Sequence, residues 1–301
     1  MDNTYHQRQI FIGISLAVLA TLIWSGNFIL ARGVIKDIPP VTLAFYRWLT
    51  ATIIILPFAW KYFVPELKII KQRFFFFLLA AGTGVSMFNT FVYIAGHYSS
   101  AINMAILGTC SSPIISVILA RIFLKERIPA VRIVGMLVCI CGILILLSKG
   151  NFQNLVSFKF TKGDWWIMAA AFTFAIYNTS VRKKPATMHP VNFLFVIFLL
   201  GTIILLPFYL FELNKEGGFA INAFNISAIL YLGIGASVIC FLIWNKAIVA
   251  LGSGRTALFG NLIPVFSSIE AVFLLHEKIT SIHIISFILV VAGLVIANLK
   301  K

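Results

Sequence analysis

The feature that most restricts the fold of this chain is a succession of ten apolar stretches separated by short polar segments. A helix needs about 20 mostly apolar residues to cross a bilayer, and each stretch has about that length. The stretches lie at residues 10–31, 41–60, 74–95, 100–122, 129–148, 164–182, 191–211, 225–247, 254–275 and 280–299. None alternates like a barrel strand, so the sequence predicts an all-α integral membrane protein with ten transmembrane helices.

Composition supports this interpretation and leaves no room for a separate soluble domain. The 301 residues are 60% hydrophobic and 11% charged, whereas soluble domains average about 45–50% and about 25%. The net charge of +15 could indicate binding to nucleic acid, but the basic residues lie at the ends of apolar stretches rather than in one stripe. We therefore expect the lipid bilayer, and no nucleic acid, as the surroundings of this chain.

The lysines and arginines also predict an orientation. Ten spans place both termini on one side of the membrane. If that side is cytoplasmic, it holds sixteen of the 24 lysines and arginines, the other side holds seven, and Arg47 lies inside a span. Because cytoplasmic loops are enriched in these residues, we expect a multi-pass protein of the inner (plasma) membrane with cytoplasmic N- and C-termini.

An internal repeat relates the two halves of the chain at an offset of 150 to 152 residues. Residues 53–58, Ile-Ile-Ile-Leu-Pro-Phe, recur at 203–208 as Ile-Ile-Leu-Leu-Pro-Phe. Each half contains five spans, an odd number, so the second copy must enter the membrane from the opposite side. We expect two inverted five-helix repeats, at 1–148 and 164–301, joined by a loop at 149–163. Such repeats are typical of transporters, in which a site near the midplane faces each side in turn.

Several short motifs are arranged in the order of a known family. They are Leu22-Ile23-Trp24-Ser25-Gly26, Phe45-Tyr46-Arg47, and the repeated pairs Pro113 with Glu126 and Pro264 with Glu277. With these motifs the chain resembles the EamA family of the drug/metabolite transporter (DMT) superfamily over essentially its whole length. The resemblance implies a ten-helix carrier of small metabolites, with a cavity formed by helices 1 to 4 and 6 to 9. The sixth span lacks the tryptophan of the family pattern, so strict symmetry of the cavity is not expected.

Small and polar residues follow one helical face of the third span and of the eighth. The two faces comprise Gly82, Ser86, Asn89, Tyr93 and Gly96, and Gly233, Ser237, Cys240, Trp244 and Ala247. Such a face can be a helix–helix seam, or it can be a cavity wall whose amide and ring groups contact a solute. On the second interpretation, the substrate-binding candidates are Trp24, Asn27, Asn89, Tyr93, Tyr177 and Trp244.

Arg47 is a further candidate for substrate binding. An unpaired guanidinium costs roughly 2.5–3.5 kcal/mol at the membrane centre, so it needs a partner or water. It could bind a substrate carboxylate or phosphate, because its planar fork matches either group. The alternatives are that it extends to the interface or pairs with Asp37.

Glu270 is the only acidic residue well inside a span. It could bind and release a proton as access alternates, or pair with a substrate amine. The alternative is a structural carboxylate that is hydrogen-bonded to Ser267 or to a neighbouring helix. A helix break near Pro113 or Pro264 could free carbonyl groups in this region.

These features favour a secondary transporter, expected to export a small, amino acid-like metabolite by alternating access. The main alternative is an exporter of lipophilic cations or drugs, and a less favoured one is a membrane scaffold or receptor that does not transport. Enzyme motifs are missing from the sequence: it has neither a Gly-x-Ser-x-Gly nor a His-Glu-x-x-His pattern. The cysteines also lack the paired spacing of a zinc site. We therefore expect no catalysis, no metal and no cofactor.

Overall fold

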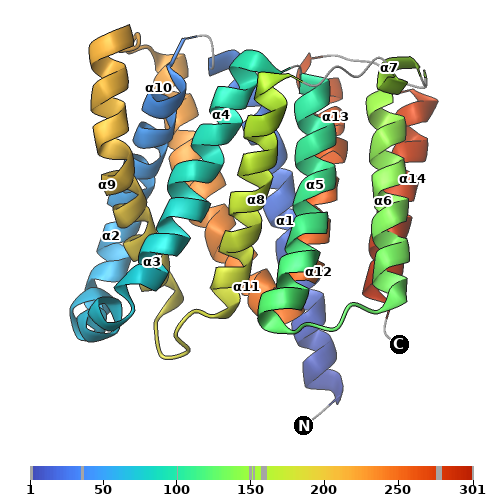
Figure 1. Cartoon of the computed structure of the whole chain (residues 1–301), viewed down its shortest axis with the longest axis horizontal. Helices are drawn as coiled ribbons and strands as arrows, with labels where there is room; N and C mark the ends of the chain where they lie inside the picture. The colour runs from blue at the N-terminus through green and yellow to red at the C-terminus, as the bar shows by residue number, and fades with distance from the viewer. Residues whose placement is uncertain are drawn as a thin grey trace.

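The computed structural model describes residues 3–34, 37–99, 101–148, 151, 153–156, 161–275 and 280–299, and it is helical without strands throughout these residues. The long helices run side by side in one bundle, and both chain ends lie at the same end of it (Figure 1). The first-half elements are α1 (Asn3–Val34), α2 (Pro40–Gln72), α3 (Phe74–Ala81), η1 (Gly82–Met87), α4 (Phe88–Tyr98), α5 (Ala101–Leu124) and α6 (Ala130–Ser148).

A short helix, α7 (Gln153–Val156), lies between the halves of the chain. The second-half elements are α8 (Lys162–Arg182), α9 (Pro190–Glu216), α10 (Ala223–Leu230), η2 (Tyr231–Ile239), α11 (Cys240–Leu251), α12 (Ser253–Ala257), η3 (Leu258–Asn261), α13 (Leu262–Leu275) and α14 (Ser281–Asn298). The chain continues from one element to the next without a turn in α3–η1–α4 and in α10–η2–α11.

Seven helical stretches within the described residues are long and apolar enough to cross a membrane, which establishes a multi-pass membrane protein. They are 7–26, 40–72, 74–98, 130–148, 190–216, 223–251 and 281–298. The expected spans at 100–122, 164–182 and 254–275 are not among them, so ten spans are not confirmed within the described residues. Helix α8 occupies the second of these three ranges. Its sequence is less apolar because it buries polar side chains, such as Thr173, Asn178 and Ser180, against other helices rather than in lipid.

Two long antiparallel pairs form opposite sides of the bundle (Figure 1). Helices α2 and α9 pack with the hydroxyls of Thr52 and Thr202 3.2 Å apart at a buried contact. Helices α6 and α14 approach so closely that a Cβ on Gly135 would lie 2.4 Å from a backbone nitrogen of α14. Small residues therefore allow backbone-to-backbone packing in this second pair.

Two π-helical segments interrupt the long helices at matching places in the two halves, with η1 at 82–87 and η2 at 231–239. A π-helix shifts the backbone hydrogen bonds by one residue, and such segments occur frequently at functional sites. Both segments contribute buried residues to the core, and irregular backbone of this kind can leave carbonyl groups within reach of side chains.

Candidate functional site

Arg47 lies at the centre of a polar network that joins α2, α4 and η2. Its side chain is 1% exposed. Nε donates to Ser237 Oγ at 2.7 Å, and Nη1 donates to Asn89 Oδ1 at 2.9 Å and to Tyr93 Oη at 3.0 Å. Nη2 donates to the Ala236 carbonyl at 3.1 Å. All four acceptors are neutral, so this buried cation is hydrogen-bonded but is not neutralised by them.

The π-helical segment η2 supplies the central acceptor of this network. The Ala236 carbonyl accepts from Trp24 Nε1 at 2.8 Å as well as from Arg47. Ser237 Oγ, which accepts from Arg47, donates to the carbonyl of Leu232, five residues earlier. The irregular backbone thus presents groups that α1 and α2 bind through side chains.

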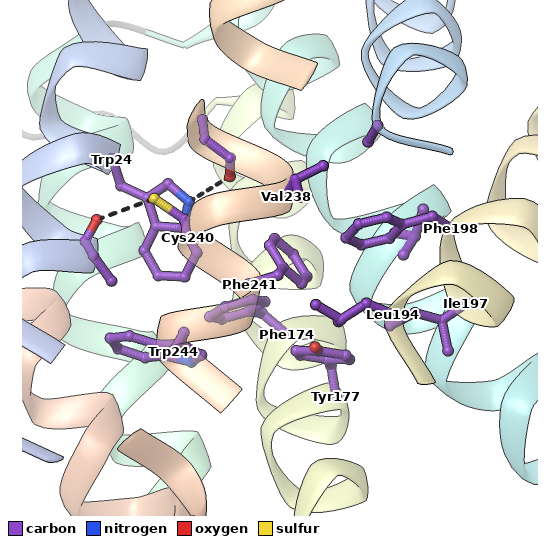
Figure 2. Packing of buried hydrophobic residues seen from close by; sticks show 14 of the residues in the cluster. Trp24, Phe174, Tyr177, Leu194, Ile197, Phe198, Val238, Cys240, Phe241 and Trp244 are labelled. Atoms are coloured by element: carbon purple, nitrogen blue, oxygen red, sulfur yellow. Dashed lines mark hydrogen bonds between the residues drawn. The ribbon is translucent and has the colours of Figure 1, made fainter. Parts of the chain in front are cut away.

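An aromatic cluster lies beside the network, between α1, α8 and α11 (Figure 2). The rings of Trp24 and Trp244 have centroids 4.9 Å apart, and Phe241 and Phe174 lie 6.0 and 5.9 Å from Trp24. Tyr177 extends the cluster, with its ring 5.4 Å from Phe241. All five side chains are buried.

Two buried amides fix the polar edges of this cluster. Trp244 Nε1 donates to Asn178 Oδ1 at 2.9 Å, and the Tyr177 hydroxyl donates to Asn245 Oδ1 at 2.8 Å. The Nδ2 donors of Asn178 and Asn245 are buried without a hydrogen-bond partner in the described part of the chain, as is that of Asn89. A buried unpaired donor costs about 1–3 kcal/mol, so these three amides are suited to donate a hydrogen bond to a ligand oxygen.

Glu270 contacts α1 rather than the Arg47 network. Its Oε1 accepts from Ser25 Oγ at 2.6 Å, and Ser267 Oγ donates to the Ser25 carbonyl at 3.3 Å. Nearby, the Tyr231 hydroxyl donates to the Ile23 carbonyl at 2.7 Å. Oε2 of Glu270 has no hydrogen-bond partner among the described residues. The carboxylate therefore anchors α13 to α1 through one oxygen and keeps the other available.

The structure thus brings most of the predicted site residues together. Arg47, Asn89 and Tyr93 form one group, and Trp24, Tyr177 and Trp244 form the other, with the Ala236 carbonyl linking the two. Glu270 hydrogen-bonds to neither group in the described part of the chain, and its partner Ser25 is next to Trp24 in α1. The side chain of Asn27 lies outside the described residues, so its predicted role is not addressed by the structure.

The face of the third span forms a helix–helix contact at one position and takes part in the Arg47 network at two others, and a cavity wall at this face stays a prediction. Ser86 Oγ donates to the Gly201 carbonyl of α9 at 3.0 Å, which makes this part of the face a seam between helices. One and two turns later, Asn89 and Tyr93 accept hydrogen bonds from Arg47. Sequence reasoning did not assign Ser25 or Asn245 to the site. The only signal for either residue was its position next to a predicted tryptophan, Trp24 or Trp244.

Comparisons with known proteins show which family and which proteins this chain is similar to. A model of the EamA-like transporter family matches residues 11–148 and again residues 161–299. A protein of Archaeoglobus fulgidus named an uncharacterized transporter is 30% identical over 291 residues, which cover 95% of this chain and 97% of that protein. Proteins of Escherichia coli and Salmonella typhimurium, each named a probable amino-acid metabolite efflux pump, are 24% and 26% identical, with 93% of both chains covered in each case.

A solved crystal structure shares the fold, with a TM-score of 0.76, 18% sequence identity and coverage of 97% of each chain. The family model matches nearly the whole length in two copies, and the relatives named above span nearly all of it as well. The protein therefore belongs to the EamA-like transporter family.

Proposed function

We propose that the protein is a secondary transporter that exports small, amino acid-like metabolites by alternating access through a central cavity. The proposal includes ten spans arranged as two inverted five-helix repeats, at 1–148 and 164–301. The duplicated family match supports this division. The names of the Escherichia coli and Salmonella typhimurium relatives support the choice of substrate class and direction.

Contacts between residues one repeat apart support the inverted arrangement. Two copies related by a twofold axis meet at equivalent positions near that axis. Thr52 and Thr202, 150 residues apart, share a hydrogen bond. Cys139 Sγ donates to the carbonyl of Val290, 151 residues later, at 3.4 Å. Both contacts lie in antiparallel pairs, α2 with α9 and α6 with α14.

The observation that carries the proposed substrate class is the Arg47 guanidinium, which is buried among neutral acceptors. A buried cation without a counter-charge is costly, and a carboxylate that reaches it when the interior opens would compensate for that cost. The unpaired amide donor of Asn89 is available for the same anion. The aromatic cluster beside the network would accommodate an apolar side chain of the substrate.

Glu270 is the proposed partner of a substrate amine or of a coupling proton. Its free Oε2 can accept a hydrogen bond from an ammonium group without the loss of the Ser25 contact. The family model matches both halves of this chain, and no motor domain lies within the matched ranges. A gradient of substrate or of protons would therefore drive transport.

A lipophilic cation is the second candidate substrate, because tryptophan rings bind cations through their faces. The Trp24–Trp244 pair and the free oxygen of Glu270 favour it, whereas Arg47 opposes it. For either substrate we place both termini on the cytoplasmic side of the inner (plasma) membrane. The positions of the lysines and arginines along the sequence support this orientation.

The test is uptake of a labelled amino acid panel, and separately of a labelled lipophilic cation, into proteoliposomes, with and without an imposed proton gradient. Arg47→Ala and Glu270→Gln are compared with Lys71→Ala, which removes an exposed charge from the end of α2. Loss of uptake in both site variants supports an amino acid-like zwitterion, and loss of cation uptake in Glu270→Gln alone supports the second candidate. If folded protein moves neither class above empty liposomes, the transport proposal fails and a scaffold or receptor takes its place.

A further inference from the structure

A charged cavity is lined by residues at the ends of α5, α8 and α11 and at the start of α6, none of which belongs to the Arg47 network. These helix ends lie at the end of the bundle where both chain termini are located (Figure 1). It has a volume of about 280 Å³ and opens to the outside. Its charged lining residues are Glu126 and Arg127 after α5, Arg132 in the first turn of α6, and Arg182 at the end of α8. Backbone of residues 249–252, at the end of α11, completes the wall.

Arg182 is held in place by the end of α11. Its Nη1 donates to the Val249 carbonyl at 3.0 Å and, at a longer 3.4 Å, to that of Ile248. Its Nε lies 3.8 Å from Glu126 Oε1, too far for a hydrogen bond. The ion pair is therefore loose, and Arg182 retains capacity for a second anionic partner.

Arg132 and Arg127 carry charge that the cavity does not compensate. The Nε of Arg132 is buried without a hydrogen-bond partner among the described residues, and its Nη1 makes only a 3.4 Å contact with the Arg127 carbonyl. Arg127 itself is exposed. The guanidinium groups of Arg127, Arg132 and Arg182 thus share the single carboxylate of Glu126. The buried Nε–H of Arg132 lacks an acceptor among the described residues.

We propose that this cavity is a binding site for a phosphate-type anion. Guanidinium groups bind phosphate oxygens through paired hydrogen bonds, and an acceptor here would satisfy Arg132 Nε. The cavity lies where the helices end, and basic pockets between membrane helices bind the phosphates of anionic lipids. The same chemistry serves the headgroup of an anionic lipid or a soluble phosphate. The proposal does not depend on which substrate is transported.

Glu126 competes with the anion for the guanidinium groups. Its carboxylate packs against Gly252, where the positive φ of 89° and the absence of a Cβ allow this approach. Removing the negative charge should free Arg182 and lower the repulsion of an incoming phosphate. We therefore predict that Glu126→Gln increases the affinity of the cavity for the anion.

The test measures thermal stability of the purified full chain in detergent as phosphatidylglycerol is titrated against a phosphatidylcholine background. In a second arm, inorganic phosphate is titrated without lipid. The variant Arg127→Gln/Arg132→Gln is compared with Lys71→Gln/Arg73→Gln, which removes the same charge from exposed positions at the end of α2. Arg127→Gln alone serves as a second variant, because an exposed side chain can be replaced without disturbing the fold.

We expect the midpoint of the phosphatidylglycerol titration to rise about tenfold in Arg127→Gln/Arg132→Gln, to stay unchanged in Lys71→Gln/Arg73→Gln, and to fall in Glu126→Gln. A response to phosphatidylglycerol alone identifies a lipid headgroup as the ligand, and an equal response to inorganic phosphate identifies a soluble anion. Equal weakening in both double variants would show a diffuse charge effect and overturn the proposal. So would the absence of any response to either anion in the unmodified protein.

Discussion

The carboxylate of Glu66 accepts hydrogen bonds at the beginning of α9, and that of Glu212 accepts them at the beginning of α2. Glu66 accepts from the His189 backbone at 2.8 Å and from Asn192 Nδ2 at 2.6 Å. Glu212 accepts from the backbone of Val41 at 3.1 Å and of Thr42 at 2.6 Å. Each of these two antiparallel helices therefore supplies the N-terminal cap of the other.

Removal of Glu212 should weaken this arrangement measurably. Pro39 and Pro40 have no N–H, so Val41 and Thr42 present the first free donors of α2, and both depend on this buried carboxylate. We expect Glu212→Ala to lower the stability by about 0.5–2 kcal/mol, seen as a lower melting temperature in detergent. Glu216→Ala, an exposed change on the last turn of the same helix, is the control. Equal melting temperatures for the two variants would contradict the capping role.

A methyl group at Gly84 should disturb the aromatic cluster. A Cβ there would lie 2.2 Å from the ring of Tyr177, whose hydroxyl is fixed by Asn245. We expect Gly84→Ala to cost about 1–3 kcal/mol of stability and to lower the transport rate, because the ring must leave its position. Gly82→Ala is a close control, since a Cβ at Gly82 meets nothing within 4 Å. Normal transport by Gly84→Ala would show that the ring position is unimportant.

Loss of the Ser237 hydroxyl should destabilise the Arg47 network. Ser237→Ala leaves the buried Nε of Arg47 without its acceptor. A charged donor left unpaired costs about 1–3 kcal/mol, so we expect a lower melting temperature of that order. Ser227→Ala, which changes an exposed serine in α10, should be neutral. If both variants have the melting temperature of the unmodified protein, the Ser237 hydroxyl does not stabilise the Arg47 network.

His189, in the loop before α9, should make stability depend on pH. Burial lowers the pKa of His189 from its ordinary value of 6.5, and the charges of Lys61 and Lys184 lower it further, while Glu66 opposes the change. The neutral ring, whose Nδ1 accepts from Val191 at 3.3 Å, is therefore favoured in the folded state. Its contribution is complete above the unfolded-state pKa and is lost as pH falls through the folded-state value.

Melting temperatures at about pH 7.5 and about pH 5.5 test this sign. The unmodified protein should lose more stability on acidification than His189→Asn, whose side chain can still accept from the backbone but does not titrate. An equal loss in both proteins would assign the pH dependence to other groups.

The membrane class and the family could be predicted from the sequence, because long apolar stretches and a whole-chain repeat determine both. Helix ends were harder to predict. The second stretch was expected to end at residue 60, whereas α2 continues to Gln72. Residues after Trp60 alternate lysines with side chains such as Phe63 and Ile70 that pack on the core, so the helix extends beyond its apolar part.

The two repeat prolines show why a helix break could not be located from the sequence. Pro113 lies inside the continuous helix α5. Pro264 lies in the first turn of α13, directly after the 3₁₀ segment η3. A proline's missing N–H is harmless in a first turn but removes a hydrogen bond in mid-helix, and tertiary packing decides which of these cases applies.

The hydrogen-bond partners of Arg47 could not be predicted from the sequence either. The two structural alternatives were extension to the interface and a pair with Asp37, but Arg47 is 1% exposed and bonds to α4 and η2. Its acceptor on Ala236 depends on the π-helical backbone of η2, and no residue pattern in that stretch distinguishes a π-helix from an α-helix. The binding roles of Arg47, Asn27 and Glu270 stay predictions.

The close packing of α6 against α14 has a consequence for how the chain is made. A Cβ on Gly293 would lie 2.6 Å from the Gly135 carbonyl, so neither helix can complete this contact without the other. The ribosome synthesises α6 well before α14, which is the last of the described helices along the chain. While the second half of the chain is synthesised, the glycine-lined side of α6 must contact lipid or an insertion factor, and this contact forms only when α14 is in place.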